Sequence, residues 1–216
     1  MDVPTLSPPA LLEKVGAIVN GHFILTSGGH AAVYVNKDAL YPRTLITANL
    51  CRAIAEAFSR DRVEAVIAPA IGGVILSQWV AFHFTQLSGR HARREVFALY
   101  AEKAEGGSFV IGRGYDKFLP GRRVLVVEDV LTTGGSAKKV VELARAAGGK
   151  VIGLGVLCNR GGVTPHDVGD VPQLFALTNI PLEVWMEGDC PLCKQGVPVN
   201  TDIGKGREFL ARQRAK

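Results

Sequence analysis

The chain has 216 residues, of which 47% are hydrophobic, and a formal net charge of +5. A chain of that length can bury one sizeable core, which predicts a single domain over residues 1–216. Residues 203–216 alone carry +4, so the basic excess is mostly a terminal tail. Phe209 is the one aromatic residue in that tail, which favours a solvated terminus over a nucleic-acid contact.

The N-terminus lacks the basic segment and apolar run of a signal peptide, so we expect a cytoplasmic protein. The uncharged stretch Ala65–Gly89 is long enough to raise the question of a membrane span. Pro69, the pair Gly72-Gly73 and several polar side chains interrupt this stretch. Because a strand, a glycine turn and a buried helix account for the same residues, we predict no membrane segment.

The first forty residues predict a small unit outside the core. A helix is expected at Pro9–Val19, followed by the segment Gly21–Tyr41 with a turn at Thr26–Gly29. Together with about residues 178–216, residues 1–41 are expected to form a hood over the ligand-binding edge of the core.

The middle of the chain alternates apolar runs with amphipathic stretches, a pattern typical of an α/β fold with a mainly parallel sheet flanked by helices. Helices of this length between strands imply parallel pairing with right-handed crossovers. The predicted strands are Val63–Ala70, Val96–Ala101, Arg123–Val127, Val151–Leu157 and Leu174–Leu177, and the predicted helices are Pro42–Phe58, Val74–Leu87 and Gly135–Ala147.

Two connections in this pattern can bind anions. Ile71, Gly72 and Gly73 follow one strand and open a helix, so their backbone N–H groups are expected to face pyrophosphate oxygens. The connection Glu102–Pro120 is long, rich in glycine and carries Lys103 and Arg113. Such a loop is either a lid that closes over the ligand or an ordinary solvated surface connection.

The most informative segment is residues 124–136. Val124–Val127 has no polar alternation and so predicts a strand buried on both faces, with Glu128 and Asp129 at its carboxyl end. The stretch from Thr132 to Ser136 then leads into a helix, and its glycines let backbone N–H groups approach an anion. Two carboxylates would repel a phosphate, so we expect them to accept hydrogen bonds from ribose hydroxyls or to help hold a divalent cation.

Competing nucleotide motifs do not fit the chain. A P-loop requires a lysine that is missing from this segment. The dinucleotide fingerprint also fails, because Cys158 stands where the third glycine after Gly153 and Gly155 is required. The acid pair together with the glycine and hydroxyl loop instead predicts a phosphorylated ribose as the ligand.

Two further groups of residues fall outside this motif. Arg160 ends another predicted strand, where its guanidinium could bind a carboxylate through two hydrogen bonds. Cys190 and Cys193 have metal-ligand spacing, but the chain has no second such pair. The segment is therefore either a bare turn or a metal site completed by a histidine or a second subunit.

The segment from Glu128 to Ser136 resembles the PRPP-binding motif of type I phosphoribosyltransferases (PRPP is 5-phosphoribosyl 1-pyrophosphate). Within that fold, the stretch Gly21–Gly28, Thr132 and Arg160 resemble the orotate phosphoribosyltransferases, and Cys190–Cys193 resembles the C-terminus of one bacterial and archaeal branch. The resemblance implies transfer of phosphoribose from PRPP to orotate with Mg²⁺ on the pyrophosphate, in a homodimer.

The resemblance also implies roles for individual residues. Glu128, Asp129 and Lys103 would be catalytic, and Arg160, Thr132 and the aromatic ring of Tyr34 would hold orotate. No residue is expected to bind metal directly except, in part, Asp129. The residues expected to contact PRPP are Ile71, Gly72, Gly73, Lys103, Glu128, Asp129, Val130, Leu131, Thr132, Thr133, Gly134, Gly135 and Ser136.

The chain departs from the family at cationic positions. Thr26 and Gly72 stand where many members have lysine, and the lid has Glu102-Lys103 where many have Arg-Lys followed by a further lysine and a histidine. Lys103, Arg113 and His30 are the candidates for compensation. Two rivals stay open: a phosphoribosyltransferase for another nucleobase, and a non-catalytic PRPP-binding regulator.

Overall fold

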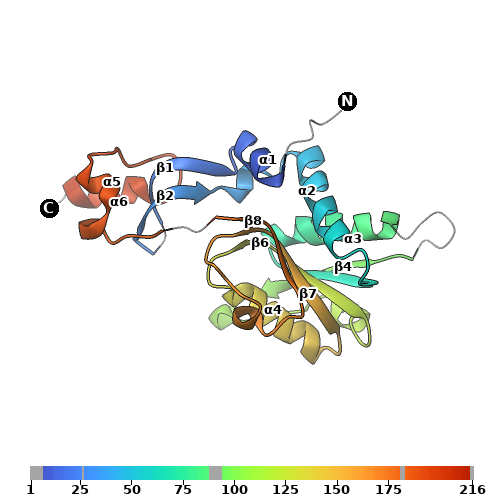
Figure 1. Ribbon diagram of the computed structural model, residues 1–216. Helices are drawn as coiled ribbons and strands as arrows, with labels where there is room; N and C mark the ends of the chain where they lie inside the picture. The colour runs from blue at the N-terminus through green and yellow to red at the C-terminus, as the bar shows by residue number, and fades with distance from the viewer. Residues whose placement is uncertain (1–6, 26, 88–93, 181–182, 215–216) are drawn as a thin grey trace.

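The computed structural model describes residues 7–25, 27–87, 94–180 and 183–214. Its centre is a six-stranded sheet in the order β5-β4-β3-β6-β7-β8 (Figure 1). All neighbouring strands are parallel except β4 and β5. The strands are β3 (Ala65–Pro69), β4 (Phe97–Lys103), β5 (Phe109–Val110), β6 (Arg123–Leu131), β7 (Lys150–Asn159) and β8 (Leu174–Asn179). The mainly parallel α/β fold predicted from the sequence is confirmed.

Helices cover both faces of this sheet (Figure 1). One apolar layer packs α2 (Thr44–Ala57) and α3 (Gly72–Leu87) against the sheet, and the other packs α4 (Gly135–Ala146) against the opposite face. Every residue of β3 is buried, as expected for a strand covered on both sides. No helix in the described ranges is long and apolar enough to cross a bilayer.

The N-terminal region differs from the prediction of one helix over Pro9–Val19. Helix α1 covers only Pro8–Lys14, because Gly16 adopts a φ of +71° and the chain enters strand β1 (Ile18–Ile24). Strand β1 pairs antiparallel with β2 (His30–Val35), and this hairpin was not predicted. The turn between the strands was predicted, although Thr26 lies outside the described residues.

The C-terminal segment packs along the hairpin rather than on the sheet (Figure 1). Its helices are α5 (Pro191–Lys194) and α6 (Gly206–Arg214). Backbone hydrogen bonds join His30 to Trp185 and His22 to Asn200. The two ends of the chain therefore form one unit beside the core, and its role as a hood over the ligand stays a prediction.

Two further boundaries correct the sequence-based picture. Strand β6 does not end at Val127 but continues to Leu131, so Glu128 and Asp129 belong to the strand itself. The connection Glu102–Pro120 is not irregular throughout, because it contains β5 and the 3-10 turns η2 (Glu105–Gly107) and η3 (Tyr115–Phe118). Phe109 of β5 is buried and anchors this connection on the α4 side of the sheet.

Candidate active site

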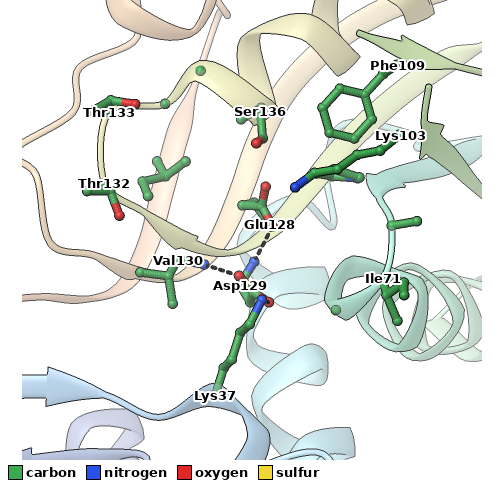
Figure 2. Close-up of a pocket in the computed structure, with 17 residues that line it drawn as sticks. Lys37, Ile71, Lys103, Phe109, Glu128, Asp129, Val130, Thr132, Thr133 and Ser136 are labelled. Atoms are coloured by element: carbon green, nitrogen blue, oxygen red, sulfur yellow. Dashed lines mark hydrogen bonds and ion pairs between the residues drawn. The ribbon is translucent and has the colours of Figure 1, made fainter. Parts of the chain in front are cut away.

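A cavity of about 230 Å³ opens at the carboxyl ends of β3 and β6, next to the start of α4 (Figure 2). This is the edge at which parallel α/β sheets bind their ligands. All the residues expected to contact PRPP lie at this cavity, with the exception of Gly73, which follows Gly72 into α3. The cavity is lined by Lys37, Pro69, Ala70, Ile71, Gly72, Lys103, Phe109, Glu128, Asp129, Val130, Leu131, Thr132, Thr133, Gly134, Gly135, Ser136 and Ala137.

The loop from Thr132 to Ser136 turns into α4 at one side of the cavity. Gly134 adopts a left-handed φ of +77° as the N-cap of α4, a conformation that glycine tolerates without strain. The side chains of Thr132, Thr133 and Ser136 are exposed. Free N–H groups at the helix start and three hydroxyls around them form a site suited to a phosphate group.

The acid pair at the end of β6 has two different environments. Oδ2 of Asp129 lies 2.8 Å from Nζ of Lys37 and accepts a 2.7 Å hydrogen bond from the hydroxyl of Tyr41. Oδ1 of Asp129 accepts a hydrogen bond from the backbone N–H of Val130. Asp129 is thus held by a cation and two donors, while Glu128 faces the cavity from the same strand (Figure 2).

Burial governs the ionisation of these groups. Burial, followed by the charge of Asp129, raises the pKa of Glu128 to about 8, which favours the protonated form of this carboxyl at neutral pH. Burial and the Asp129 carboxylate also raise the pKa of Tyr41, which keeps its hydroxyl a donor. Burial lowers the pKa of Lys37, but the hydrogen bond to Asp129 and its charge outweigh that effect and raise it.

The packing around Gly72 explains why the chain has no lysine at this position. A Cβ at this position would overlap Oδ2 of Asp129 and would lie 2.9 Å from the hydroxyl of Tyr41 and 3.2 Å from Nζ of Lys37. A side chain there cannot fit while Asp129 keeps its partners. The ammonium of Lys37, which comes from the turn after β2, lies in the space beside Gly72.

The residues before Gly72 in this loop also line the cavity. The Ala70–Ile71 peptide is cis, and the side chain of Ile71 is 87% exposed. The N–H of Ala70 donates to the carbonyl of Ala101 on the adjacent strand, which fixes the start of the loop.

Lys103 is the residue of the Glu102–Pro120 connection that was expected at the ligand, and it lines the cavity. Its side chain is exposed and extends from the end of β4 toward Glu128 (Figure 2). Arg113, another candidate for compensation, instead forms an exposed ion pair with Glu102 at 3.0 Å. His30 is fully buried in the hairpin and does not line the cavity.

Arg160 and Tyr34 do not line this cavity. Arg160 directly follows β7, where the N–H groups of Arg160 and Gly161 both donate to the carbonyl of Leu131. The side chain of Asn159 closes the same loop through two hydrogen bonds to the backbone of Val163. Arg160 is therefore held next to the loop from Thr132 to Ser136, whereas Tyr34 packs on Phe23 in the hairpin.

Sequence reasoning assigned no role to Lys37 or Tyr41. The contact between Tyr41 and Asp129 spans 88 positions of sequence, and only the folded chain brings the residues together. Phe109, which lines the cavity beside Lys103, was also missed, because its segment was expected to lack regular structure.

Comparison with known proteins agrees with this geometry. Residues 38–188 match the family model described as the phosphoribosyl transferase domain. An orotate phosphoribosyltransferase of Pelotomaculum thermopropionicum is 40% identical over 189 residues, which cover 88% of this chain and 92% of that protein. The chain belongs to the orotate phosphoribosyltransferase family. The enzyme of that name from Thermotoga maritima is also 40% identical, over 91% of this chain and 97% of its own length.

Solved structures support the fold assignment to this family. The orotate phosphoribosyltransferase from Aeropyrum pernix has a TM-score of 0.59 at 28% identity, and the match covers 79% of this chain and 92% of that one. An adenine phosphoribosyltransferase from Rhodothermus marinus has a TM-score of 0.58 at 22% identity, covering 80% and 99%. At 22% identity, the similarity to the adenine phosphoribosyltransferase concerns the fold alone.

Proposed function

We propose that this chain is an orotate phosphoribosyltransferase, which transfers the 5-phosphoribosyl group of PRPP to N1 of orotate and releases pyrophosphate. One observation carries the proposal: the acid pair of β6 and the anion-binding loop before α4 line the same cavity. Relatives that cover most of the chain and bear that enzyme name support the choice of orotate as acceptor.

The reaction breaks the bond between C1 of ribose and the pyrophosphate oxygen, whose electron pair leaves with pyrophosphate. N1 of the orotate anion supplies the pair for the new bond to C1. Positive charge develops on the ribose ring and negative charge on the leaving group. A protein lowers this barrier by holding the two reactants together and by stabilising the separating charges, without a covalent nucleophile.

The cavity offers a separate partner for each part of PRPP. The N–H groups and hydroxyls of Thr132–Ser136 would bind the 5-phosphate. Glu128 and Asp129 would accept hydrogen bonds from the ribose hydroxyls and offset the positive charge of the ring. A hydroxyl that donates to Glu128 favours its ionised form, so PRPP binding is expected to lower the raised pKa of this carboxyl.

Two lysines flank the position left for pyrophosphate. Lys103 extends from the end of β4 toward Glu128, and Lys37 extends from the turn after β2 toward Asp129 (Figure 2). We assign both ammonium groups to the pyrophosphate, together with the backbone of Ile71, Gly72 and Gly73. Lys37 would thereby replace the lysine that many members carry at the position of Gly72.

The oxygen donors of the cavity fit a Mg²⁺ ion that arrives with PRPP. Oδ2 of Asp129 already faces Lys37 and Tyr41, and Oε1 of Glu128 accepts the N–H of Asp129, so few carboxylate oxygens are free. Mg²⁺ prefers one or two carboxylates, substrate phosphates and water over an all-protein cage. Mg²⁺ bound to PRPP would neutralise charge on the pyrophosphate, and Asp129 is the carboxylate assigned to help hold it.

Orotate would occupy the space next to the loop that carries Arg160. The guanidinium of Arg160 can bind the orotate carboxylate through two hydrogen bonds, and Thr132 lies on the adjacent turn. Tyr34 is assigned to the same substrate by family resemblance and would have to approach from the hairpin.

We further propose that the enzyme forms a homodimer and acts in the cytoplasm. Leu45 of α2 and Phe82 of α3 are 67% and 46% exposed on the outer helical layer. Apolar side chains exposed on neighbouring elements are typical of a protein interface. Sedimentation equilibrium at micromolar concentration is expected to give twice the chain mass, and a monomer would contradict this part of the proposal.

The function is tested by incubating the purified chain with PRPP, Mg²⁺ and orotate while recording orotate absorbance and released pyrophosphate. We expect the two signals to change in equal amounts. Turnover of adenine, guanine or uracil without turnover of orotate would overturn the acceptor. PRPP binding without turnover of any base would favour a regulator instead.

A further inference from the structure

Four potential metal ligands meet in the unit formed by the two ends of the chain, outside the cavity described above. They are His22 of β1, His30 at the start of β2, and Cys190 and Cys193 around α5. Their ligand atoms all lie within 4.8 Å of one another. His22, His30 and Cys190 are almost wholly buried, and Cys193 is partly buried.

The spacing of these atoms is close to that of a tetrahedral site. Nε2 of His22 lies 3.7 Å from Sγ of Cys190 and 3.8 Å from Sγ of Cys193. Nδ1 of His30 lies 3.3 Å from Sγ of Cys193 and 2.9 Å from Nε2 of His22. Zinc–sulfur bonds of about 2.3 Å and zinc–nitrogen bonds of about 2.0–2.1 Å give a tetrahedron with edges of about 3.3–3.8 Å. The three nitrogen–sulfur distances fall in this range, whereas the two histidine nitrogens are at hydrogen-bond distance and must separate by about 0.4 Å to bind one ion.

The histidines are oriented as ligands. Nδ1 of His22 lies 2.8 Å from the carbonyl of Val197, which can only accept, so this nitrogen carries the proton and Nε2 presents a lone pair to the cluster. A metal-bound histidine usually shows such a hydrogen bond at its second nitrogen. Among the described residues Nε2 of His30 has no hydrogen-bond partner, and the polar contacts of this ring are made by Nδ1 within the cluster.

The C-terminal segment needs a cross-link of this kind. Among residues 183–213 only Cys190 and Gly206 are buried, so this stretch has no apolar core of its own. It is held on the hairpin by backbone hydrogen bonds at His22, Ile24 and His30. Small units that cannot bury enough apolar surface are commonly stabilised by disulfides or by a structural metal.

We propose that His22, His30, Cys190 and Cys193 bind one Zn²⁺ ion in a closed structural site. The ion fastens the C-terminal segment to the β1–β2 hairpin and so completes the unit beside the core. Two thiolates and two imidazoles in a tetrahedral arrangement are the ligand set of structural zinc sites. Four protein ligands leave no open position for a substrate, so this ion takes no part in the transfer reaction.

Binding of Zn²⁺ by these four residues also gives Cys190 and Cys193 the further ligands that the sequence alone did not identify. No second cysteine pair is needed, because the hairpin supplies two histidines from positions more than 160 residues away. The other two cysteines, Cys51 and Cys158, are buried elsewhere in the core and are not part of the cluster.

The first test is the metal content of the untagged full chain, purified without chelator and measured by inductively coupled plasma mass spectrometry. We expect about one zinc per chain, falling to about a tenth or less in Cys190→Ser and Cys193→Ser. Cys51→Ala, a matched buried cysteine outside the cluster, is expected to keep its zinc. Wild-type protein without stoichiometric metal, or with a Cys190–Cys193 disulfide, would overturn the proposal.

A second measurement remains decisive if the cysteine variants fail to fold. Wild-type protein is stripped of metal with a chelator and titrated with Co²⁺, which reports thiolate ligands and tetrahedral geometry by its absorption bands. We expect saturation at one Co²⁺ per chain and recovery of hydrogen-exchange protection in β1, β2 and residues 183–214. Octahedral bands, or protection that is the same in stripped and reconstituted protein, would exclude a structural metal site.

Discussion

The ammonium of Lys37 lies 2.8 Å from Oδ2 of Asp129, and the pair closes one wall of the cavity at the end of β6. Replacing Lys37 by Met keeps most of the side-chain length and removes the charge. We expect kcat/KM for PRPP to fall about 10–100-fold, because the pyrophosphate loses a cation and Asp129 loses its charged partner. Steady-state kinetics with varied PRPP measure the change.

The matched control is Lys150→Met, at the exposed start of β7 and away from the cavity. It should leave the kinetics unchanged within about twofold, as surface substitutions do. Equal values of kcat/KM for wild type and Lys37→Met would remove Lys37 from the site.

Lys103 lines the cavity from the end of β4, and its loss should mainly affect turnover. Lys103→Ala is expected to lower kcat about 10-fold or more while the melting temperature stays the same, since the side chain is exposed. Lys117→Ala, an exposed lysine in the same connection, serves as control. If both variants lose activity equally, the effect belongs to the charge of the connection and not to Lys103.

The raised pKa of Glu128 predicts that the free energy of unfolding depends on pH. Its pKa rises from the ordinary value to about 8 on folding, so the folded state holds the proton more tightly than the unfolded chain. Burying the ionised carboxylate lowers the free energy of unfolding. This loss is absent below the ordinary carboxyl pKa, grows as the pH rises and reaches its full size above about pH 8. Glu128→Gln keeps the shape without the ionisation.

We therefore expect the melting temperature of Glu128→Gln at pH 9 to be about 2–8 °C above that of wild type, because its free energy of unfolding rises by about 1–2 kcal/mol. At pH 4 the two melting temperatures should be nearly the same. Its activity should fall, because an amide accepts hydrogen bonds from ribose hydroxyls less strongly than a carboxylate. Differential scanning calorimetry without ligand checks the first expectation. A melting difference that does not change with pH would show that Glu128 is not the responsible group.

Local patterns were sufficient to predict five of the six strands of the sheet and the edge at which the cavity lies. The strand before Glu128, the glycines of Thr132–Ser136 and the helix after them all have short-range signals, and the cavity contains them as expected. The length of β6 was underestimated, because two carboxylates normally mark the end of a strand. Here β7 continues to pair beside them as far as Asn159.

Contacts between distant parts of the chain could not be predicted in the same way. Lys37 and Tyr41 approach Asp129 only after the hairpin has packed against the core, and no periodicity reports that approach. The same reason applies to the ligands His22 and His30, which the sequence alone could not join to Cys190 and Cys193.

Gly72 gives a steric test of the pyrophosphate loop. A Cβ in Gly72→Ala would overlap Oδ2 of Asp129, so the carboxylate must leave its partners Lys37 and Tyr41. We expect KM for PRPP to rise about 10-fold, with a smaller change in melting temperature. Gly188→Ala, whose Cβ meets no atom within 4 Å, is the control. Normal kinetics in Gly72→Ala would show that Asp129 is free to move.

Gly161 tests whether the loop after β7 positions the orotate site. A Cβ on Gly161 would overlap the backbone carbonyl of Thr132, which is not a flexible side chain, so the two loops must separate. Gly161→Ala is expected to raise KM for orotate at least about 10-fold, because Arg160 and Thr132 would no longer face one substrate together.

Gly162→Ala distinguishes this overlap from general strain in the loop. Its Cβ meets no atom within 4 Å, but its φ of +63° disfavours any side chain, at a cost of about 1–2 kcal/mol. We expect this variant to lose stability while KM for orotate stays near that of wild type. If both substitutions raise KM for orotate equally, strain in the loop, and not its contact with Thr132, controls the acceptor site.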